Sequence, residues 1–201
     1  MLMLDFVKAK QYILNLLGAD LSDDFIYHDL AHTLDVYRAA THLADLSDID
    51  GHDLVLLQTA ALYHDVGLVE IIDKHEEKGV EIVNSVLPEY GYSKDDIDII
   101  SNMILSTKLP QSPKTILAEL LCDADLDYLG RDDFFMTGTK LHLEWQRMNI
   151  MNVPFDEWIA IQKSFLISHH YFSNAARVLR EDGKQNNLKQ LEGICEFGKS
   201  K

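Results

Sequence analysis

The stretch that decides the fold reads Ala60-Ala61-Leu62-Tyr63-His64-Asp65-Val66-Gly67. It closes a strongly apolar run that begins at Leu54, and Gly67 favours the end of a helix at this point. His64 and Asp65 end the apolar helix, and such side chains must find partners because burying them unpaired costs free energy. The stretch therefore predicts a buried helix with a polar pair at its end.

The rest of the chain repeats the helical pattern. Apolar residues recur at helical spacing almost everywhere, and no alternating run bounded by turn signals predicts a strand. We therefore predict an all-α bundle of about eight to nine helices. Glycines and prolines mark the expected ends of the helices. The expected helices cover residues 5–17, 28–46, 52–66, 75–87, 93–107, 113–128, 131–149, 154–180 and 184–197.

Length and composition favour a single domain over residues 1–201. The chain is 47% hydrophobic and 25% charged, which is enough apolar material for one sizeable core. No repeat, low-complexity tract or linker divides it.

Charge and cysteine content limit the partners and the location. The formal net charge of -15 repels extended nucleic acid and anionic lipid, so we expect neither as a partner. No apolar run approaches the length of a membrane span, and residues 1–6 lack the basic start of a signal peptide. Cys122 and Cys195 have no metal-like spacing and fit a reducing compartment as packing residues. We therefore expect a cytoplasmic protein, whose oligomeric state the sequence leaves open.

Two further segments carry histidines and acids that match the pair at 64–65. His28 and His32 stand four residues apart in the expected helix 28–46, so their side chains share one face. In the segment from Ile116 to Leu129, steps of 100° per residue place Asp125 within about 40° of the apolar direction. Asp125 is therefore the acid that is expected to face inward.

Two other acids of this segment point elsewhere. The side chains of Asp123 and Asp127 point more than about 100° away from the apolar direction of this helix. We interpret them as solvated residues, or as residues that hold the free ring N–H of a ligand histidine.

His32, His64, Asp65 and Asp125 together predict a metal site. Two imidazole nitrogens and two carboxylates suit one divalent ion such as Mn2+, Fe2+, Co2+, Ni2+, Zn2+ or Mg2+, and leave positions open for water and substrate. The alternative is that these buried groups only hydrogen-bond to one another.

The same residues resemble the H…HD…D signature of the HD-domain metal-dependent phosphohydrolase superfamily. The resemblance covers roughly residues 25–130 and is similar to small bacterial stand-alone members. It implies a helical fold and hydrolysis of phosphate esters, with helices 131–201 as a buttress or lid of the pocket. The matching segments are Tyr-His-Asp-Leu-Ala-His-Thr (27–33), Ala-Ala-Leu-Tyr-His-Asp-Val-Gly (60–67), His-Glu-Glu-Lys-Gly (75–79) and Asp-Ala-Asp-Leu-Asp-Tyr-Leu-Gly (123–130).

The resemblance also implies a role for His28. Cyclic-nucleotide phosphodiesterases of the superfamily have a Tyr-His-Asn-x-x-His motif, whose first histidine is the general acid and whose second is a metal ligand. Here Asp29 replaces the asparagine. The alternative reading of His28 is a residue that caps or packs at a helix start.

The resemblance bears on the number of ions as well. Two-metal branches carry further histidines after the HD pair, commonly one on the helix that corresponds to 93–107. That helix ends here in Thr107 and Lys108 without a histidine, so we expect one ion. His75 and Glu76 line the mouth of the site, reach a second ion through water, or simply start the next helix.

A mechanism follows from these residues. A bound ion lowers the pKa of its water from about 15.7 toward about 7 to 9. Asp65 or Asp125 then accepts the proton of the attacking water, and His28 protonates the leaving oxygen. We take Asp65 and His28 as the catalytic pair.

Phosphate also needs positive charge, which is scarce in this chain. Lys108 is the first candidate, and His75, Lys140 and Arg147 are the others, each with a solvated surface role as the alternative. The expected partner is a small phosphorylated molecule such as a nucleotide or cyclic nucleotide.

Two other functions are alternatives to the predicted phosphohydrolase. One is a ligand-binding or regulatory module that keeps the metal without turnover. The other is oxygenase chemistry at a di-iron site, against which the missing histidine at Thr107 weighs. His169 and His170 have no ligand-like partner four residues away, and we read them as packing or helix-face residues.

Overall fold

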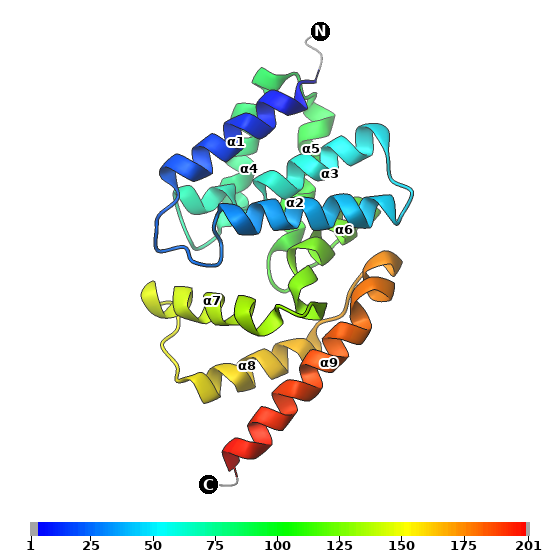
Figure 1. The fold of residues 1–201 in the computed structure, drawn as a ribbon. Coiled ribbons are helices and arrows are strands. Elements are labelled where there is room, and N and C mark those ends of the chain that lie inside the picture. Colours follow the sequence, from blue (N-terminus) through cyan, green and yellow to red (C-terminus); the bar gives the residue numbers. More distant parts are fainter. Residues whose placement is uncertain (1–3, 200–201) are drawn as a thin grey trace. The chain divides into compact units, whose positions relative to one another are not determined.

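The computed structural model describes the backbone of residues 4–199 and the side chains of residues 4–194. Within these ranges the regular structure is entirely helical, which confirms the all-α prediction (Figure 1). The contacts divide the chain into two compact units. The first contains residues up to Ser22 and His28–Asp125, and the second contains Asp23–Tyr27 and the chain from Leu126 on. That residues 1–201 form a single domain stays a prediction.

The first unit is built around one buried helix, α3. This helix packs against α1, α2, α5 and α6, and Leu56, Ala60 and Tyr63 are completely buried. A helix enclosed in this way needs apolar residues all round, which is the physical reason for its composition. The unit consists of α1 (Phe6–Asp20), α2 (Leu30–Asp45), α3 (Gly51–Tyr63), α4 (His75–Val86), α5 (Lys94–Thr107) and α6 (Ile116–Asp125), with 3-10 turns η1 (Val66–Val69) and η2 (Leu87–Tyr90).

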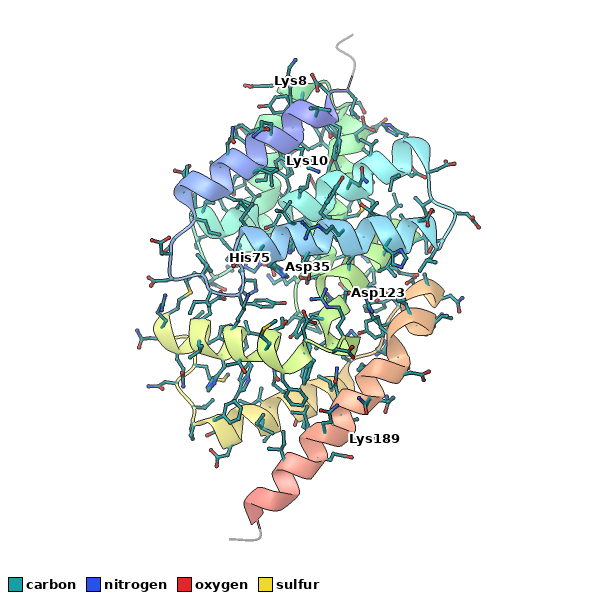
Figure 2. All side chains as sticks on the ribbon, in the orientation of Figure 1. Lys8, Lys10, Asp35, His75, Asp123 and Lys189 are labelled. Carbon is teal, nitrogen blue, oxygen red and sulfur yellow. The ribbon has the colours of Figure 1, made fainter. Side chains whose placement is uncertain are left out.

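Side-chain caps start several of these helices. Asp29 accepts a hydrogen bond from the backbone N–H of His32 at 2.8 Å and so begins α2. Ser93 and Asp96 form a capping box at the start of α5. The ammonium of Lys10 in α1 lies 4.0 Å from the centre of the Tyr37 ring in α2, which ties these two helices together (Figure 2).

The second unit has its own core. It contains η3 (Asp127–Gly130), α7 (Phe134–Arg147), α8 (Phe155–Ser168) and α9 (Asn174–Lys199). The Asn187 side chain of α9 donates to the carbonyl oxygens of Leu129 and Arg131, and so holds α9 against η3. The buried cluster consists of Tyr27, Leu126, Tyr128, Leu129, Phe134, Ile159, Leu166 and Leu191.

Two expected helices around the site are shorter than predicted. The helix expected at 28–46 begins at Leu30, because Asp29 caps it and leaves His28 outside. The helix expected at 113–128 ends at Asp125 and is followed by η3. Other ends differ by a few residues, as for α7, expected at 131–149.

The prediction of helices at 154–180 and 184–197 is wrong. The chain leaves the helix after Ser168, and Ser173 caps a new one by accepting a hydrogen bond from the N–H of Ala176 at 3.1 Å. Helix α9 then runs straight through Gly183, where the sequence predicted a break. No helix of the described residues is both long and apolar enough to span a membrane.

Candidate metal centre

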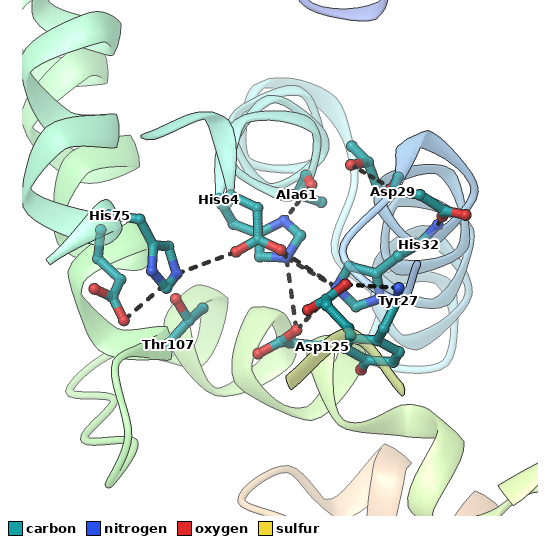
Figure 3. Close-up of polar contacts among 12 residues, drawn as sticks. Tyr27, Asp29, His32, Ala61, His64, His75, Thr107 and Asp125 are labelled. Carbon is teal, nitrogen blue, oxygen red and sulfur yellow. Dashed lines mark hydrogen bonds and ion pairs between the residues drawn. The ribbon is translucent and has the colours of Figure 1, made fainter. Parts of the chain in front are cut away.

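Three helix ends of the first unit bring the polar residues together (Figure 3). His32 lies in the first turn of α2, which Asp29 caps. His64 is the residue at which α3 ends, and Asp65 follows it directly before η1. Asp125 is the last residue of α6. Because α2, α3 and α6 pack against one another, these ends meet in one place.

The donor atoms of His32, His64 and Asp125 all lie within 4.8 Å of one another. The two Nε2 atoms of the histidines are 3.3 Å apart, and Asp125 Oδ1 is 3.5 Å from each of them. Two atoms that each lie about 2.1 Å from one ion can be at most about 4.2 Å apart. These contacts therefore have the dimensions of a single coordination sphere.

Asp65 adds a fourth donor. Its Oδ2 atom lies 3.1 Å from His64 Nε2 and 3.5 Å from His32 Nε2. Oδ2 is buried and accepts no hydrogen bond from any described residue. A buried carboxylate oxygen without a hydrogen bond is costly unless a cation satisfies it, so the residues present fit a metal ion.

The orientation of His64 supports the same reading. Its Nδ1 lies 2.9 Å from the carbonyl oxygen of Ala61, which can only accept, so Nδ1 carries the proton. In its neutral form the ring then presents the lone pair of Nε2 toward the carboxylates and His32, where an ion would bind. Fixing the tautomer of a ligand histidine through its second nitrogen is a recurring feature of metal sites.

Asp123 and Asp127 are not solvated residues, and the reading in which Asp123 holds a ligand histidine stays a prediction. Their exposed fractions are 1% and 2%, so neither is solvated. Asp127 accepts hydrogen bonds from Arg180 Nε at 2.6 Å and Nη2 at 2.9 Å, and contacts Arg131 at 3.5 Å, rather than holding a ligand histidine. The predicted direction of the Asp127 side chain is wrong because α6 ends two residues before it, so steps of 100° per residue no longer apply there.

The charges of the four residues reinforce one another. Burial would lower the pKa of His32, but the carboxylates of Asp125 and Asp65 outweigh it and raise this pKa to about 9. The pKa of His64 is also raised, against the effect of its burial, by the same two carboxylates. Burial would raise the pKa values of Asp65 and Asp125, but the histidines hold both well below the usual range. The centre therefore attracts positive charge, which a proton or a metal ion can supply.

His75 lies on the other side of the Asp65 carboxylate. Its Nε2 is 3.4 Å from Asp65 Oδ1 and 3.6 Å from Glu76 Oε1. Burial lowers its pKa, but Asp65 outweighs this effect and raises the pKa to about 9. His75 is also the first residue of α4, which confirms that it starts this helix, whereas its place at the mouth of the site stays a prediction. The Thr107 hydroxyl donates to the carbonyl oxygen of Ile104 in its own helix.

His28 lies next to the centre although it is outside α2. Its ring centroid is 5.6 Å from that of His32, in an edge-to-face arrangement. The prediction that the two histidines share a helix face is wrong, because Asp29 is the cap and His28 precedes it. Its position follows instead from the non-helical backbone before the cap.

The predicted phosphate-binding cations have other partners or lie elsewhere in the chain. Lys108 is half-exposed, and its ammonium is 2.6 Å from Glu77 Oε1. Lys140 and Arg147 belong to α7 in the second unit, where both are exposed and Arg147 Nη1 donates to the carbonyl oxygen of Asp23. Their contact with a substrate stays a prediction.

One neighbour of the centre has no signal in the sequence. Gln111, between α5 and α6, donates a hydrogen bond to Asp125 Oδ2 at 3.4 Å. No motif or periodicity singles out a glutamine in a connecting segment, so only the fold could identify it.

An all-helical unit with a His-His-Asp cluster at three helix ends, partly to fully buried, defines a class of candidate metalloproteins. The model of the HD domain family matches residues 27–127, which is half of the chain. The chain belongs to this family. Family membership and the cluster of His32, His64 and Asp125 together support a site that can hold a metal ion.

One relative in sequence is an uncharacterized protein of Clostridium beijerinckii. It is 34% identical over 104 residues, which cover 50% of this chain and 64% of the relative. The match thus spans slightly less than two thirds of the relative's length.

Several solved structures share the fold. A protein from Lactobacillus plantarum has a TM-score of 0.69 at 17% identity, over 98% of this chain and 97% of its own. Bacillus subtilis YpgQ, solved in complex with ADP, has a TM-score of 0.65 at 17% identity, over 96% and 94%. A predicted HD superfamily hydrolase from an uncultured Thermotogales bacterium has a TM-score of 0.60 at 22% identity, over 93% and 91%.

Proposed function

We propose that this chain is a metal-dependent phosphohydrolase that cleaves a phosphate ester of a small molecule such as a nucleotide or cyclic nucleotide. The observation that carries the proposal is the Asp65 carboxylate. One of its oxygens faces His32 and His64 without a hydrogen bond, and the other faces His75. Such a carboxylate can serve a metal ion on one side and a proton on the other.

His32, His64, Asp65 and Asp125 would hold one divalent ion. Nitrogen and carboxylate donors suit Mn2+, Fe2+, Co2+, Ni2+, Zn2+ or Mg2+. When bound, such an ion makes hydroxide available near neutral pH and offsets the charge of a phosphoryl oxygen.

The remaining steps belong to residues of the chain. Asp65 Oδ1, the oxygen that points toward His75 Nε2, accepts the proton of the attacking water. His28, in ring contact with His32, donates a proton to the leaving oxygen. With Asp29 as the cap of α2, the backbone beside His28 is fixed in the same way as an asparagine cap would fix it.

Charge and one structural relative favour a nucleotide-sized substrate. The net charge of -15 opposes a phosphate polymer or an anionic membrane, while a small phosphate ester needs only local neutralisation. Bacillus subtilis YpgQ, which shares the fold, was solved with ADP. A cytoplasmic location, where nucleotides are abundant, is part of the same proposal.

The proposal is tested by elemental analysis of protein purified without chelator, followed by incubation with a panel of nucleotides and cyclic nucleotides. Mn2+, Co2+, Ni2+ and Mg2+ are added in turn, and chromatography separates phosphate, pyrophosphate and nucleotide products. We expect metal-dependent hydrolysis that Asp125→Asn abolishes. Asp98→Asn is the control, because it removes the same charge from an exposed surface pair with Lys94.

His28→Ala separates catalysis from metal binding. General acid catalysis contributes typically about 10²- to 10⁴-fold, so turnover should fall by that factor while the metal content stays that of the wild type. Unchanged turnover would remove His28 from the mechanism.

Stoichiometric metal without turnover of any phosphate ester would favour the alternative, a ligand-binding or regulatory module. Two irons per chain would instead point to oxygenase chemistry.

A further inference from the structure

Gln111 lies in the segment between α5 and α6 and is half-buried. Its side-chain Nε2 donates to the carbonyl oxygen of Cys122 at 3.2 Å and to Asp125 Oδ2 at 3.4 Å. A primary amide carries two N–H groups, so it can make both bonds at once. One glutamine thus contacts the backbone and a site carboxylate of the same helix.

The backbone contact serves as an anchor that does not depend on a metal ion. Cys122 lies in the last turn of α6, where carbonyl groups have no partner within the helix. The same residue donates from Sγ to the carbonyl oxygen of Ser106 at 3.1 Å, which joins this turn to α5. Gln111 therefore holds Asp125 relative to a fixed part of the first unit.

Because of this contact, the two carboxylate oxygens of Asp125 have different neighbours. Oδ1 lies 3.5 Å from the Nε2 atoms of both His32 and His64, whereas Oδ2 faces Gln111. With Oδ2 engaged by an N–H donor, Oδ1 is the oxygen that the carboxylate offers most readily to an ion.

We propose that Gln111 is a positioning residue that holds Asp125 as a one-oxygen metal ligand and thereby sets the metal affinity of the centre. The inference rests on the proposed metal site and adds a residue to it. Loss of such an outer partner of a ligand typically weakens metal binding by about 10- to 100-fold.

Gln111→Met tests the inference because it keeps a side chain of similar length and removes both donors. Gln58→Met is the matched control. Gln58 is a half-buried glutamine of the same unit that donates to Thr41 Oγ1 at 3.1 Å, away from the site residues. Gln111→Ala provides a second variant in case the methionine side chain repacks.

The measurement is a competition titration of Mn2+ and Co2+ against a chromogenic chelator, together with the Tm of the chelator-treated proteins and the visible spectrum of the Co2+ forms. We expect Gln111→Met to bind both ions about 10- to 100-fold more weakly than the wild type. Its Co2+ spectrum should change, and its metal-free Tm should match that of Gln58→Met.

Equal affinity in Gln111→Met and Gln58→Met would overturn the inference, as would a wild type that binds no ion. A metal-free Tm that falls well below that of the control would assign Gln111 to structure alone. Metal binding that depends on Gln111, without hydrolysis of any phosphate ester, would uphold this inference and reject the proposed function.

Discussion

His169 at the end of α8 is half-buried, and both of its ring nitrogens are buried without a hydrogen bond to any described residue. The sequence predicts a packing or helix-face residue, and the structure places it at the C-cap of α8, where its backbone N–H donates to the carbonyl oxygen of Phe165. Its carbonyl oxygen accepts a hydrogen bond from Lys184 Nζ at 2.8 Å, and its ring lies edge-on to Tyr171 at 4.7 Å. An imidazole in this setting is held neutral.

His169→Phe should remove a pH-dependent loss of stability. Burial and the positive charges of Lys184 and His170 lower the pKa of His169 from 6.5 to about 4, and Glu181 offsets this only in part. The unfolded chain therefore takes up a proton at higher pH than the folded chain, and wild-type stability falls as the pH falls from about 6.5 to 4. The free energy of unfolding of the wild type should fall relative to the variant by about 2 kcal/mol between pH 7 and pH 5.

Urea unfolding at several pH values measures this difference. At pH 7 the variant should be at least as stable as the wild type, because it removes two buried polar atoms that lack hydrogen bonds. A difference that stays constant with pH would contradict the expectation.

Helix α9 depends on a close backbone contact at Gly183. A Cβ atom at this position would lie 2.0 Å from the carbonyl oxygen of Gly130, and one at Gly130 would lie 2.4 Å from that of Arg180. The two glycines therefore allow α9 to approach η3, next to the pair of Asp127 and Arg180. This close approach explains why a glycine, which has low helix propensity, stands within α9.

Gly183→Ala and Gly193→Ala should have opposite effects on stability, although both lie in α9. At Gly193 nothing lies within 4 Å of an added Cβ, so alanine should stabilise by up to about 1 kcal/mol through helix propensity. At Gly183 the clash should outweigh the same gain and destabilise by about 1 to 3 kcal/mol, as overpacking does. Thermal and urea unfolding of both variants provide the measurement, and equal shifts of the same sign would argue against the close contact.

The molecule as a whole carries an excess of negative charge, and part of this charge lies at the candidate metal centre. Thirty-three acidic residues stand against eighteen basic ones. Asp65 and Asp125, with lowered pKa values, contribute to that excess at the ends of α3 and α6. A cation bound there stabilises the folded chain because the unfolded chain does not assemble the site.

Removal of the metal should therefore lower the stability of the protein. At free metal about 100 times the Kd the loss amounts to about 2.7 kcal/mol. Calorimetry with and without chelator gives the change in Tm, and hydrogen exchange shows where protection is lost. We expect the loss in α2, α3 and α6, which carry the four proposed ligands or end directly before them. Lost protection confined to α7, α8 and α9 would contradict the assignment of the centre.

Local patterns in the sequence predicted a large part of this protein. Helical periodicity predicted the all-α class and most of the helices, because the apolar face of a helix requires apolar residues at a fixed spacing within a short segment. The HD resemblance predicted family membership, and the inward facing of Asp125 agrees with its place beside His32 and His64.

Contacts between distant residues decided the rest. Gly183 continues a helix because Gly130 lies against it, and Asp127 is buried because Arg180 meets it. Gln111 became visible only when the fold brought it to Asp125. The sequence by itself determined which segments are helical and which residues carry metal-binding chemistry, since both depend on residue type and local spacing. Only the tertiary structure decided where helices end and which donor meets which acceptor, because those free energies arise between residues far apart in the chain.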